Sequence, residues 1–210
     1  MGKLMDRLYD NIDKAKAFAL SFTNFAYFYD DWEDSDTHTI LCGHCGKAFQ
    51  YADYLMPRAS AKKPTAILHS LEFGVSPELR NELISRFDIT EEDFRPIRTK
   101  HGEIVYYQIT PQHVMLPLSE VNEWPVVSTC PVCGNVRYGG SGKRNEKKEE
   151  YNYITQDALC NMHDLNVTYE KVGRLDIPDF IVSRRVYDYL TECFPRTHYV
   201  PYFLKEDVDE

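Results

Sequence analysis

The feature that most constrains the fold of this 210-residue chain is a pair of CxxCG motifs, at positions 42–46 and 130–134. A CxxC turn brings two sulfur atoms near one point, and zinc favours tetrahedral coordination by thiolates. The glycine that ends each motif suits a backbone position with positive φ. We therefore predict one structural zinc ion that joins the two halves of the chain. Its ligands are expected to be Cys42, Cys45, Cys130 and Cys133.

Four cysteine ligands close a zinc site and leave no position for a substrate. Metal binding contributes about 10–16 kcal/mol to the folding of zinc-dependent peptides. This is enough to offset closure of the long loop between Cys45 and Cys130, because the entropy of closure grows only with the logarithm of loop length. The zinc is thus expected to be structural.

The first motif, Cys42-Gly43-His44-Cys45, also has the four letters of a disulfide isomerase active site. Redox chemistry of that kind requires the first cysteine at the N-terminus of a helix, whose dipole lowers the pKa of the thiol. Gly46 follows the motif at once, no aromatic residue stands directly before Cys42, and redox chemistry leaves the second motif unexplained. A thiol oxidoreductase remains an alternative. In the metal-binding interpretation, His44 is expected to face solvent.

The charge of the chain favours a protein ligand over a nucleic acid. It carries 33 acidic and 24 basic side chains, a formal net charge of −9. Nucleic-acid binding draws much of its affinity from basic groups on phosphates, whereas an acidic surface attracts a basic protein. A zinc-ribbon nucleic-acid module stays open as an alternative, with Arg137, Lys143 and Arg144 as its local candidates.

The sequence shows neither a membrane span nor an export signal. No apolar stretch is long enough to cross a bilayer, and Asp6, Asp10 and Asp13 interrupt the N-terminal segment. We therefore expect a cytoplasmic protein with no membrane partner, whose cysteines are metal ligands or free thiols. Cys160 and Cys193 belong to no motif and are expected to be buried thiols.

The N-terminal part of the chain combines an amphipathic pattern with a strongly acidic stretch. Residues 3–20 are predicted to form a helix, because apolar residues recur at helical spacing from Leu4 to Ala15. The aromatic run at 22–29 is a candidate strand, and residues 30–36 are predicted to form a surface loop. A tryptophan among carboxylates is a candidate anchor for a basic partner, although a solvated loop explains the same charges. The residues of this candidate surface are Asp30, Asp31, Trp32, Glu33, Asp34 and Asp36.

Each half of the chain carries the same series of features after its CxxCG motif. An aromatic-x-Val-Ser segment, at 73–76 and 180–183, precedes apolar residues at helical spacing. An aromatic-x-Pro segment follows at 94–96 and 199–201. The serine of each unit has the position of a helix N-cap. The shared order favours a degenerate internal repeat, although any two strand–helix–strand units have some of these features in common.

We therefore predict an α+β protein with two similar strand–helix–strand lobes joined through a zinc-ribbon-like CxxCG/CxxCG site. Residues 1–36 would hold the N-terminal helix, the aromatic strand and the acidic loop. Residues 37–129 would form the first lobe and residues 130–210 the second, packed as one compact unit. A strand is also expected at 103–110, which is rich in β-branched and aromatic residues.

No catalytic motif stands out. The histidines are scattered, the paired carboxylates lie in solvated runs, and the glycine-rich segment at 139–143 lacks the spacing of a phosphate-binding loop. The chain is therefore predicted not to be an enzyme.

Two CxxCG motifs, each followed by an aromatic-x-Val-Ser helix unit, resemble the double-CxxCG immunity proteins of bacterial polymorphic toxin systems. The resemblance covers the chain from Leu41 onwards and leaves the segment from Lys3 to Leu20 as an addition. It implies a non-catalytic cytoplasmic protein that binds and neutralises a cognate protein toxin, and it assigns the zinc role to the four motif cysteines. A generic zinc-stapled scaffold protein fits the same residues.

Overall fold

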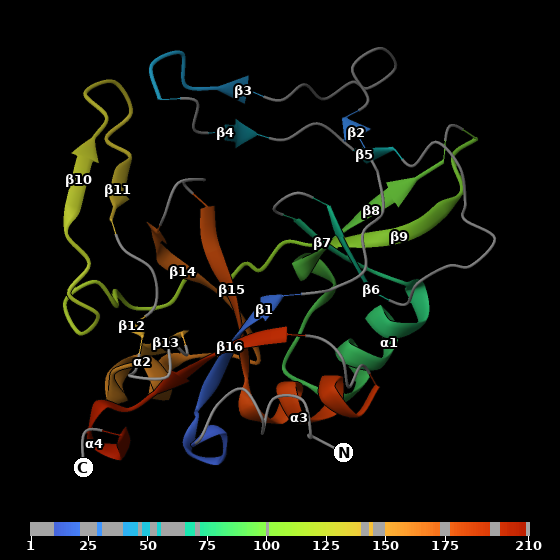
Figure 1. The fold of residues 1–210 in the computed structure, drawn as a ribbon. Helices are drawn as coiled ribbons and strands as arrows, with labels where there is room; N and C mark the ends of the chain where they lie inside the picture. Colours follow the sequence, from blue (N-terminus) through green and yellow to red (C-terminus); the bar gives the residue numbers. More distant parts are fainter. Residues whose placement is uncertain are drawn as a thin grey trace.

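The computed structural model contains both helices and strands, which confirms the α+β class. The strands form an eight-stranded sheet, a six-stranded sheet and a small two-stranded sheet (Figure 1). The structure describes residues 11–21, 29–30, 40–45, 48–50, 54–55, 66–69, 72–99, 101–139, 143–144, 150–172, 177–193 and 198–208.

The eight-stranded sheet contains both chain-end strands, β1 and β16. Its strands, in spatial order, are β10 (Val126–Thr129), β11 (Val136–Tyr138), β14 (Leu165–Val172), β15 (Ile177–Ser183), β1 (Ala17–Ser21), β16 (His198–Phe203), β13 (Glu150–Tyr153) and β12 (Lys143–Arg144). Strand β1 lies between β15 and β16 and is antiparallel to both.

The helix expected at residues 3–20 is wrong for the part that the structure describes. Ile12–Lys14 form a single 3₁₀ turn, and Ala17–Ser21 form strand β1. The helical spacing ends at Ala15, and the first four residues of β1 are consecutive apolar side chains that are all buried. Such a run is typical of a central strand with both faces covered, and two partner strands bind its backbone. Residues 3–10 lie outside the described chain.

The six-stranded sheet and the two-stranded sheet come from the first part of the sequence. In spatial order, the six strands are β2 (Tyr29–Asp30), β5 (Tyr54–Leu55), β8 (Phe94–Arg98), β9 (Ile104–Ile109), β7 (Glu72–Val75) and β6 (Ala66–His69). The two-stranded sheet pairs β3 (Ile40–Leu41) with β4 (Ala48–Gln50). The strand expected at 103–110 is β9.

The two larger sheets share one strand order. The run β6-β7-β9-β8-β5-β2 corresponds to β14-β15-β1-β16-β13-β12. In each run one pair of neighbouring strands is parallel, β8–β5 in the first and β16–β13 in the second. The other four pairs of each run are antiparallel. The register agrees as well: the cross-strand row Val75–Tyr107–Pro96 corresponds to the row Val182–Phe18–Pro201. The N-terminal strand β1 therefore occupies the position that β9 occupies in the other sheet.

A helix follows the equivalent strand in each sheet. Helix α1 (Pro77–Arg86) follows β7, and α3 (Arg184–Cys193) follows β15. The hydroxyl of Ser76 accepts the backbone N–H of Leu79 at 3.2 Å, which confirms the predicted N-cap. The described part of the chain also contains α2 (Gln156–Asn161), α4 (Lys205–Val208) and the 3₁₀ turn Glu91–Asp93.

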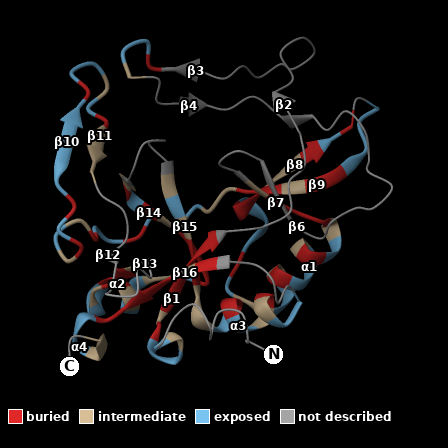
Figure 2. Ribbon diagram, viewed as in Figure 1, coloured by how far each residue is buried: buried red, intermediate tan, exposed pale blue. Residues whose placement is uncertain are grey.

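The core spans both sheets. One buried cluster combines Val75 and Leu79 from the β7–α1 unit with Val182 and Val186 from the β15–α3 unit. The opposite face of the eight-stranded sheet packs on a second cluster, which includes Leu118, Trp124 and Ala158. Buried residues consequently occupy the centre of the molecule, between the helices and the eight-stranded sheet (Figure 2).

A buried carboxylate links the two helical units. Asp164 accepts the backbone N–H of Asp88, just beyond α1, at 2.7 Å and the hydroxyl of Ser183 at 2.5 Å. It also pairs with the guanidinium of Arg185 at the start of α3. Burial alone would raise the pKa of Asp164, but these hydrogen bonds outweigh burial and hold that pKa below its ordinary value. The folded state therefore favours the ionised carboxylate.

We predict that Asp164→Asn lowers the unfolding free energy by about 1–3 kcal/mol at pH 7, because it weakens a buried acceptor and removes its charge. A carboxylate whose pKa is lower in the folded state stabilises the fold above its unfolded pKa of about 3.9. The difference between wild type and variant should therefore be constant above about pH 5 and shrink as the pH falls through the folded pKa.

Urea unfolding at a series of pH values measures the difference in unfolding free energy between wild type and variant. The contributions of titratable groups that both proteins share cancel in this difference. The exposed carboxylate of Glu120, which has no ion pair among the described residues, provides the control, since Glu120→Gln should change the unfolding free energy by no more than about 0.5 kcal/mol. A difference for Asp164→Asn that did not vary with pH would contradict the charged role of this residue.

Candidate metal centre

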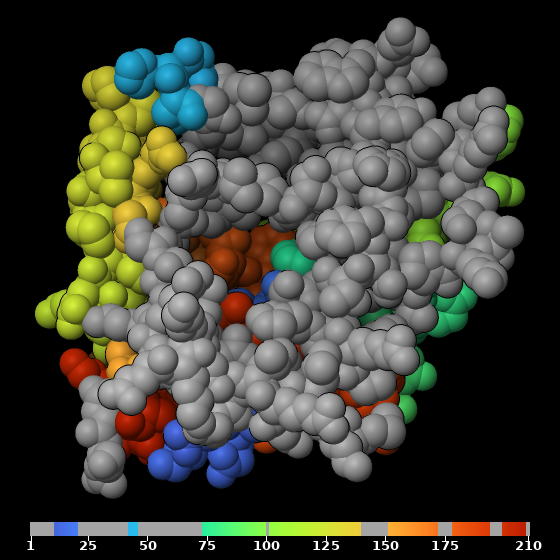
Figure 3. Space-filling view, in the orientation of Figure 1, coloured from blue at the N-terminus to red at the C-terminus, as the bar shows by residue number. Residues whose placement is uncertain are grey.

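Each CxxCG motif lies between the strands of a β-hairpin. The first follows β3 and precedes β4, and the second lies between β10 and β11. In the space-filling view, residues 42–45 (light blue) lie at the end of the β10–β11 hairpin (yellow), at one corner of the molecule (Figure 3). Two hairpins from distant parts of the chain thus meet at their tips.

The four motif cysteines converge on one point. The Sγ atoms of Cys42 and Cys130 are 3.9 Å apart, and those of Cys45 and Cys133 are 3.6 Å apart. All four sulfur atoms lie within 4.8 Å of one another. Four sulfurs bound tetrahedrally at about 2.3 Å from zinc are about 3.8 Å apart, so these spacings fit a central ion. The cluster is therefore positioned to bind a metal ion, as the motif spacing predicted.

The same sulfur distances exclude disulfides between these two pairs. An S–S bond is about 2.05 Å long, far shorter than either contact. Cys42 and Cys130 are buried, and Cys45 and Cys133 are half-buried. The cluster is thus partly shielded from solvent, and its four side chains fill a tetrahedral coordination shell without a substrate position.

The backbone of the second motif folds tightly around Cys130. Its carbonyl oxygen accepts the N–H of Gly134 at 2.9 Å, and its own N–H donates to the carbonyl of Asn135 at 2.8 Å. Gly134 has a φ of +69°, the left-handed conformation predicted for this glycine. Its counterpart in the first motif, Gly46, lies outside the described residues.

Backbone amides favour the thiolate form of the first cysteine in each motif. Hydrogen bonds from the N–H groups of Cys45 and His44 lower the pKa of Cys42 to about 6, although burial opposes the shift. In the second motif, a hydrogen bond from the N–H of Cys133 is the largest cause that lowers the pKa of Cys130. Metal ions bind the thiolate, so both motifs are arranged for ligation.

The surroundings of the first motif do not match a redox active site. Strand β4, rather than a helix, comes next among the described residues, so Cys42 lacks the helix N-terminus that the redox alternative requires. The motif's sulfur atoms instead contact those of the second motif. His44 is exposed, as expected for the metal-binding interpretation.

The acidic stretch proposed as a partner surface is not described beyond its first residue. Asp30 is the last residue of strand β2. Asp31, Trp32, Glu33, Asp34 and Asp36 lie outside the described residues, so their part in binding stays a prediction.

The expectation that Cys160 and Cys193 are buried is wrong, because both side chains are exposed. Cys160 lies two residues beyond Ala158, the buried residue of α2, and therefore points to the opposite side of that short helix. Cys193 is the last residue of α3, beyond its buried residues. A cysteine's average preference for burial does not decide its position at the end of a surface helix.

The structure brings together two histidines that looked scattered in the sequence. The rings of His113 and His163 have centroids 4.2 Å apart, and His163 Nδ1 lies 3.0 Å from Asp88 Oδ2. Burial, followed by the charge of His163, lowers the pKa of His113. Among the described residues, however, the four motif cysteines form the only group of three or more histidine, cysteine, aspartate or glutamate side chains close enough to hold a metal ion. The histidine pair is therefore not part of such a group.

The basic residues of the nucleic-acid alternative lie on separate strands. Arg137 is half-buried on β11, whereas Lys143–Arg144 form β12, near the other end of the strand order of the eight-stranded sheet. These strands are not neighbours in the sheet, whereas a basic face beside the motifs would require the three residues to lie close together.

Comparison with known proteins adds no family assignment. No family model matches the sequence, and no curated protein or solved structure shows significant similarity to it. A search of the described helices finds none with the length and apolar character of a membrane span. The family resemblance carried by the CxxCG motifs therefore stays a prediction.

We predict that Cys130→Ser abolishes stoichiometric metal binding, because the cluster loses one of its four thiolates. The melting temperature should fall by more than about 10 °C, since bound zinc contributes several kcal/mol to folding in comparable sites. Elemental analysis and calorimetry measure the two effects. Cys160→Ser is the matched control at an exposed cysteine and should retain the metal. Full metal content and an unchanged melting temperature in Cys130→Ser would contradict the shared site.

Proposed function

We propose that this chain is an immunity protein that binds and neutralises a cognate bacterial toxin, and that its cysteine cluster holds a structural zinc ion. The observation that carries the proposal is the convergence of two CxxCG motifs, 88 residues apart, on one group of four sulfur atoms. A shared site between two such motifs is what the resemblance to double-CxxCG immunity proteins implies.

The donor set supports zinc as the metal. Soft thiolate ligands favour zinc over hard cations such as magnesium or calcium, and tetrahedral sulfur spacing is typical of structural zinc sites. With four protein ligands the ion has no open position, so its role would be to fix the two hairpins rather than to catalyse a reaction. This supports a binding protein rather than an enzyme.

The shared strand order of the two larger sheets supports the internal repeat. We interpret them as two related strand–helix–strand lobes that meet at the metal hairpins and at the core between α1 and α3. In this interpretation the metal and the common core fix the relative position of the lobes. A rigid, cytoplasmic scaffold of this kind could occlude a toxin sterically, and a net charge of −9 would attract a basic toxin.

Co-expression tests the proposed function directly. We expect this chain to restore growth of bacteria that express the toxic domain encoded next to its gene, and to form a stable complex with that domain. Cys160→Ser should protect as wild type does. Cys130→Ser should protect poorly, because loss of the metal destabilises the scaffold. If the wild-type chain neither protects nor binds, the immunity proposal is wrong, and a metal-stabilised scaffold for another partner remains.

A further inference from the structure

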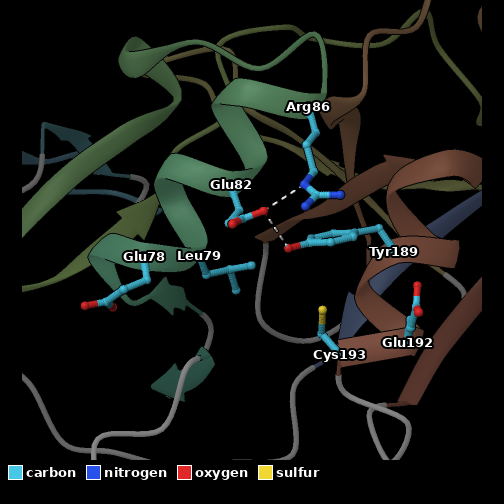
Figure 4. Close-up of a pocket in the computed structure, with 7 residues that line it drawn as sticks. All are labelled: Glu78, Leu79, Glu82, Arg86, Tyr189, Glu192 and Cys193. Carbon is cyan, nitrogen blue, oxygen red and sulfur yellow. Dashed lines mark hydrogen bonds and ion pairs between the residues drawn. The ribbon is translucent and has the colours of Figure 1, made fainter.

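Helices α1 and α3 border an open groove with a volume of about 630 Å³ (Figure 4). Its carboxylates come from both helices: Glu78 and Glu82 from α1, and Glu192 from α3. The half-buried ring of Tyr189 supplies most of the apolar part of its lining, since Leu79, which also lines the groove, is almost fully buried. The groove thus combines an apolar surface with an excess of negative charge.

One guanidinium already lies against this lining. Arg86 Nε donates to Glu82 Oε2 at 2.7 Å, and the guanidinium carbon lies 5.1 Å from the centroid of the Tyr189 ring. The hydroxyl of Tyr189 donates to the same carboxylate oxygen at 3.4 Å. Figure 4 shows these three side chains turned towards one another. A carboxylate beside an aromatic face is a favourable environment for an arginine or lysine side chain.

The resident arginine leaves part of the negative charge without a partner. Among the described residues, Glu192 has no ion pair, and Glu82 uses only Oε2 in the contacts with Arg86 and Tyr189. Burial, followed by a hydrogen bond with Cys193, raises the pKa of Tyr189 to about 12, so its hydroxyl stays neutral. The groove therefore has acceptor oxygens for a second cation beside the first.

The same residues do not suit a metal site. The groove carboxylates are not among the described groups close enough to hold a metal ion. An extended organic cation, which spans the distance between separated carboxylates, fits better than a bare ion.

We propose that the groove between α1 and α3 binds an arginine or lysine side chain presented by a protein partner. The aliphatic part of that side chain would lie against the ring of Tyr189, and its cation would reach Glu192 and the second oxygen of Glu82. The partner is a basic segment of the cognate toxin, and to this extent the inference rests on the proposed function.

Charge reversal in the groove tests the inference. Glu192→Lys places a cation in the groove without breaking an ion pair, and Glu206→Lys on α4 makes the same charge change at another exposed site. The probe is a catalytically inactivated form of the toxin domain encoded next to the gene. We expect Glu192→Lys to weaken its binding about tenfold or more at physiological salt, and Glu206→Lys to stay within about twofold of wild type.

A thiol footprint locates the contact independently. In a metal-loaded Cys160→Ser background, maleimide labelling of the exposed Cys193 should slow when the toxin domain binds, because Cys193 lines the groove. If the domain binds wild type and Glu192→Lys equally and leaves the labelling rate unchanged, the groove inference is wrong while the immunity proposal stands.

A second probe separates the two proposals if the wild-type chain does not bind the toxin domain. A hexa-arginine peptide supplies the same cation without the toxin. Protection of Cys193 by this peptide, lost in Glu192→Lys and kept in Glu206→Lys, would support a groove for basic segments even though the immunity proposal had failed. Absence of protection in all three proteins would overturn the groove inference as well.

Discussion

The arrangement of the two hairpins depends on four sulfur atoms gathered within 4.8 Å of one another. Four thiolates held this close would repel one another without a cation between them, so the cluster is positioned to bind a metal ion. A bound ion would supply folding free energy at a place where the hairpins are too short to supply it themselves. Strand β3 has two residues and strand β4 has three, and short two-stranded pairs are marginal in water.

The metal cluster and the hydrophobic core act at different places in the molecule. The cluster lies at one corner, at the tips of two hairpins (Figure 1). Helix α3 packs on β1 and β15 of the eight-stranded sheet, and α1 packs on β9 of the six-stranded sheet. The rings of Phe73 in β7 and Phe180 in β15 are tilted against each other with centroids 5.4 Å apart. Asp164 connects the end of α1 to the start of α3. The first and second parts of the chain therefore meet at two separate points, at the cysteine cluster and in the hydrophobic core.

Local chemistry explains what the sequence could predict. The spacing of each CxxC pair brings two sulfurs together whatever the rest of the fold, so the four candidate ligands followed directly from the motifs. The cap at Ser76 was predictable for the same reason, since it depends on a hydrogen bond to a residue three positions away.

Features that depend on contacts between distant parts of the chain could not be predicted in this way. Strand β1 resembles a helix until β15 and β16 are known to flank it, and the exposure of Cys193 depends on where α3 ends relative to the core. The α1–α3 groove could not be predicted, because Glu82 and Tyr189 lie 107 residues apart and only packing brings them into contact.

Cadmium substitution followed by ¹¹³Cd NMR tests the central claim most directly, because scalar coupling identifies the residues bonded to the ion. The shared site predicts one cadmium resonance with couplings to the β-protons of all four cysteines, Cys42, Cys45, Cys130 and Cys133. Two resonances, each coupled to the cysteines of a single motif, or one resonance coupled to one motif alone, would contradict a metal ion that joins the two halves of the chain.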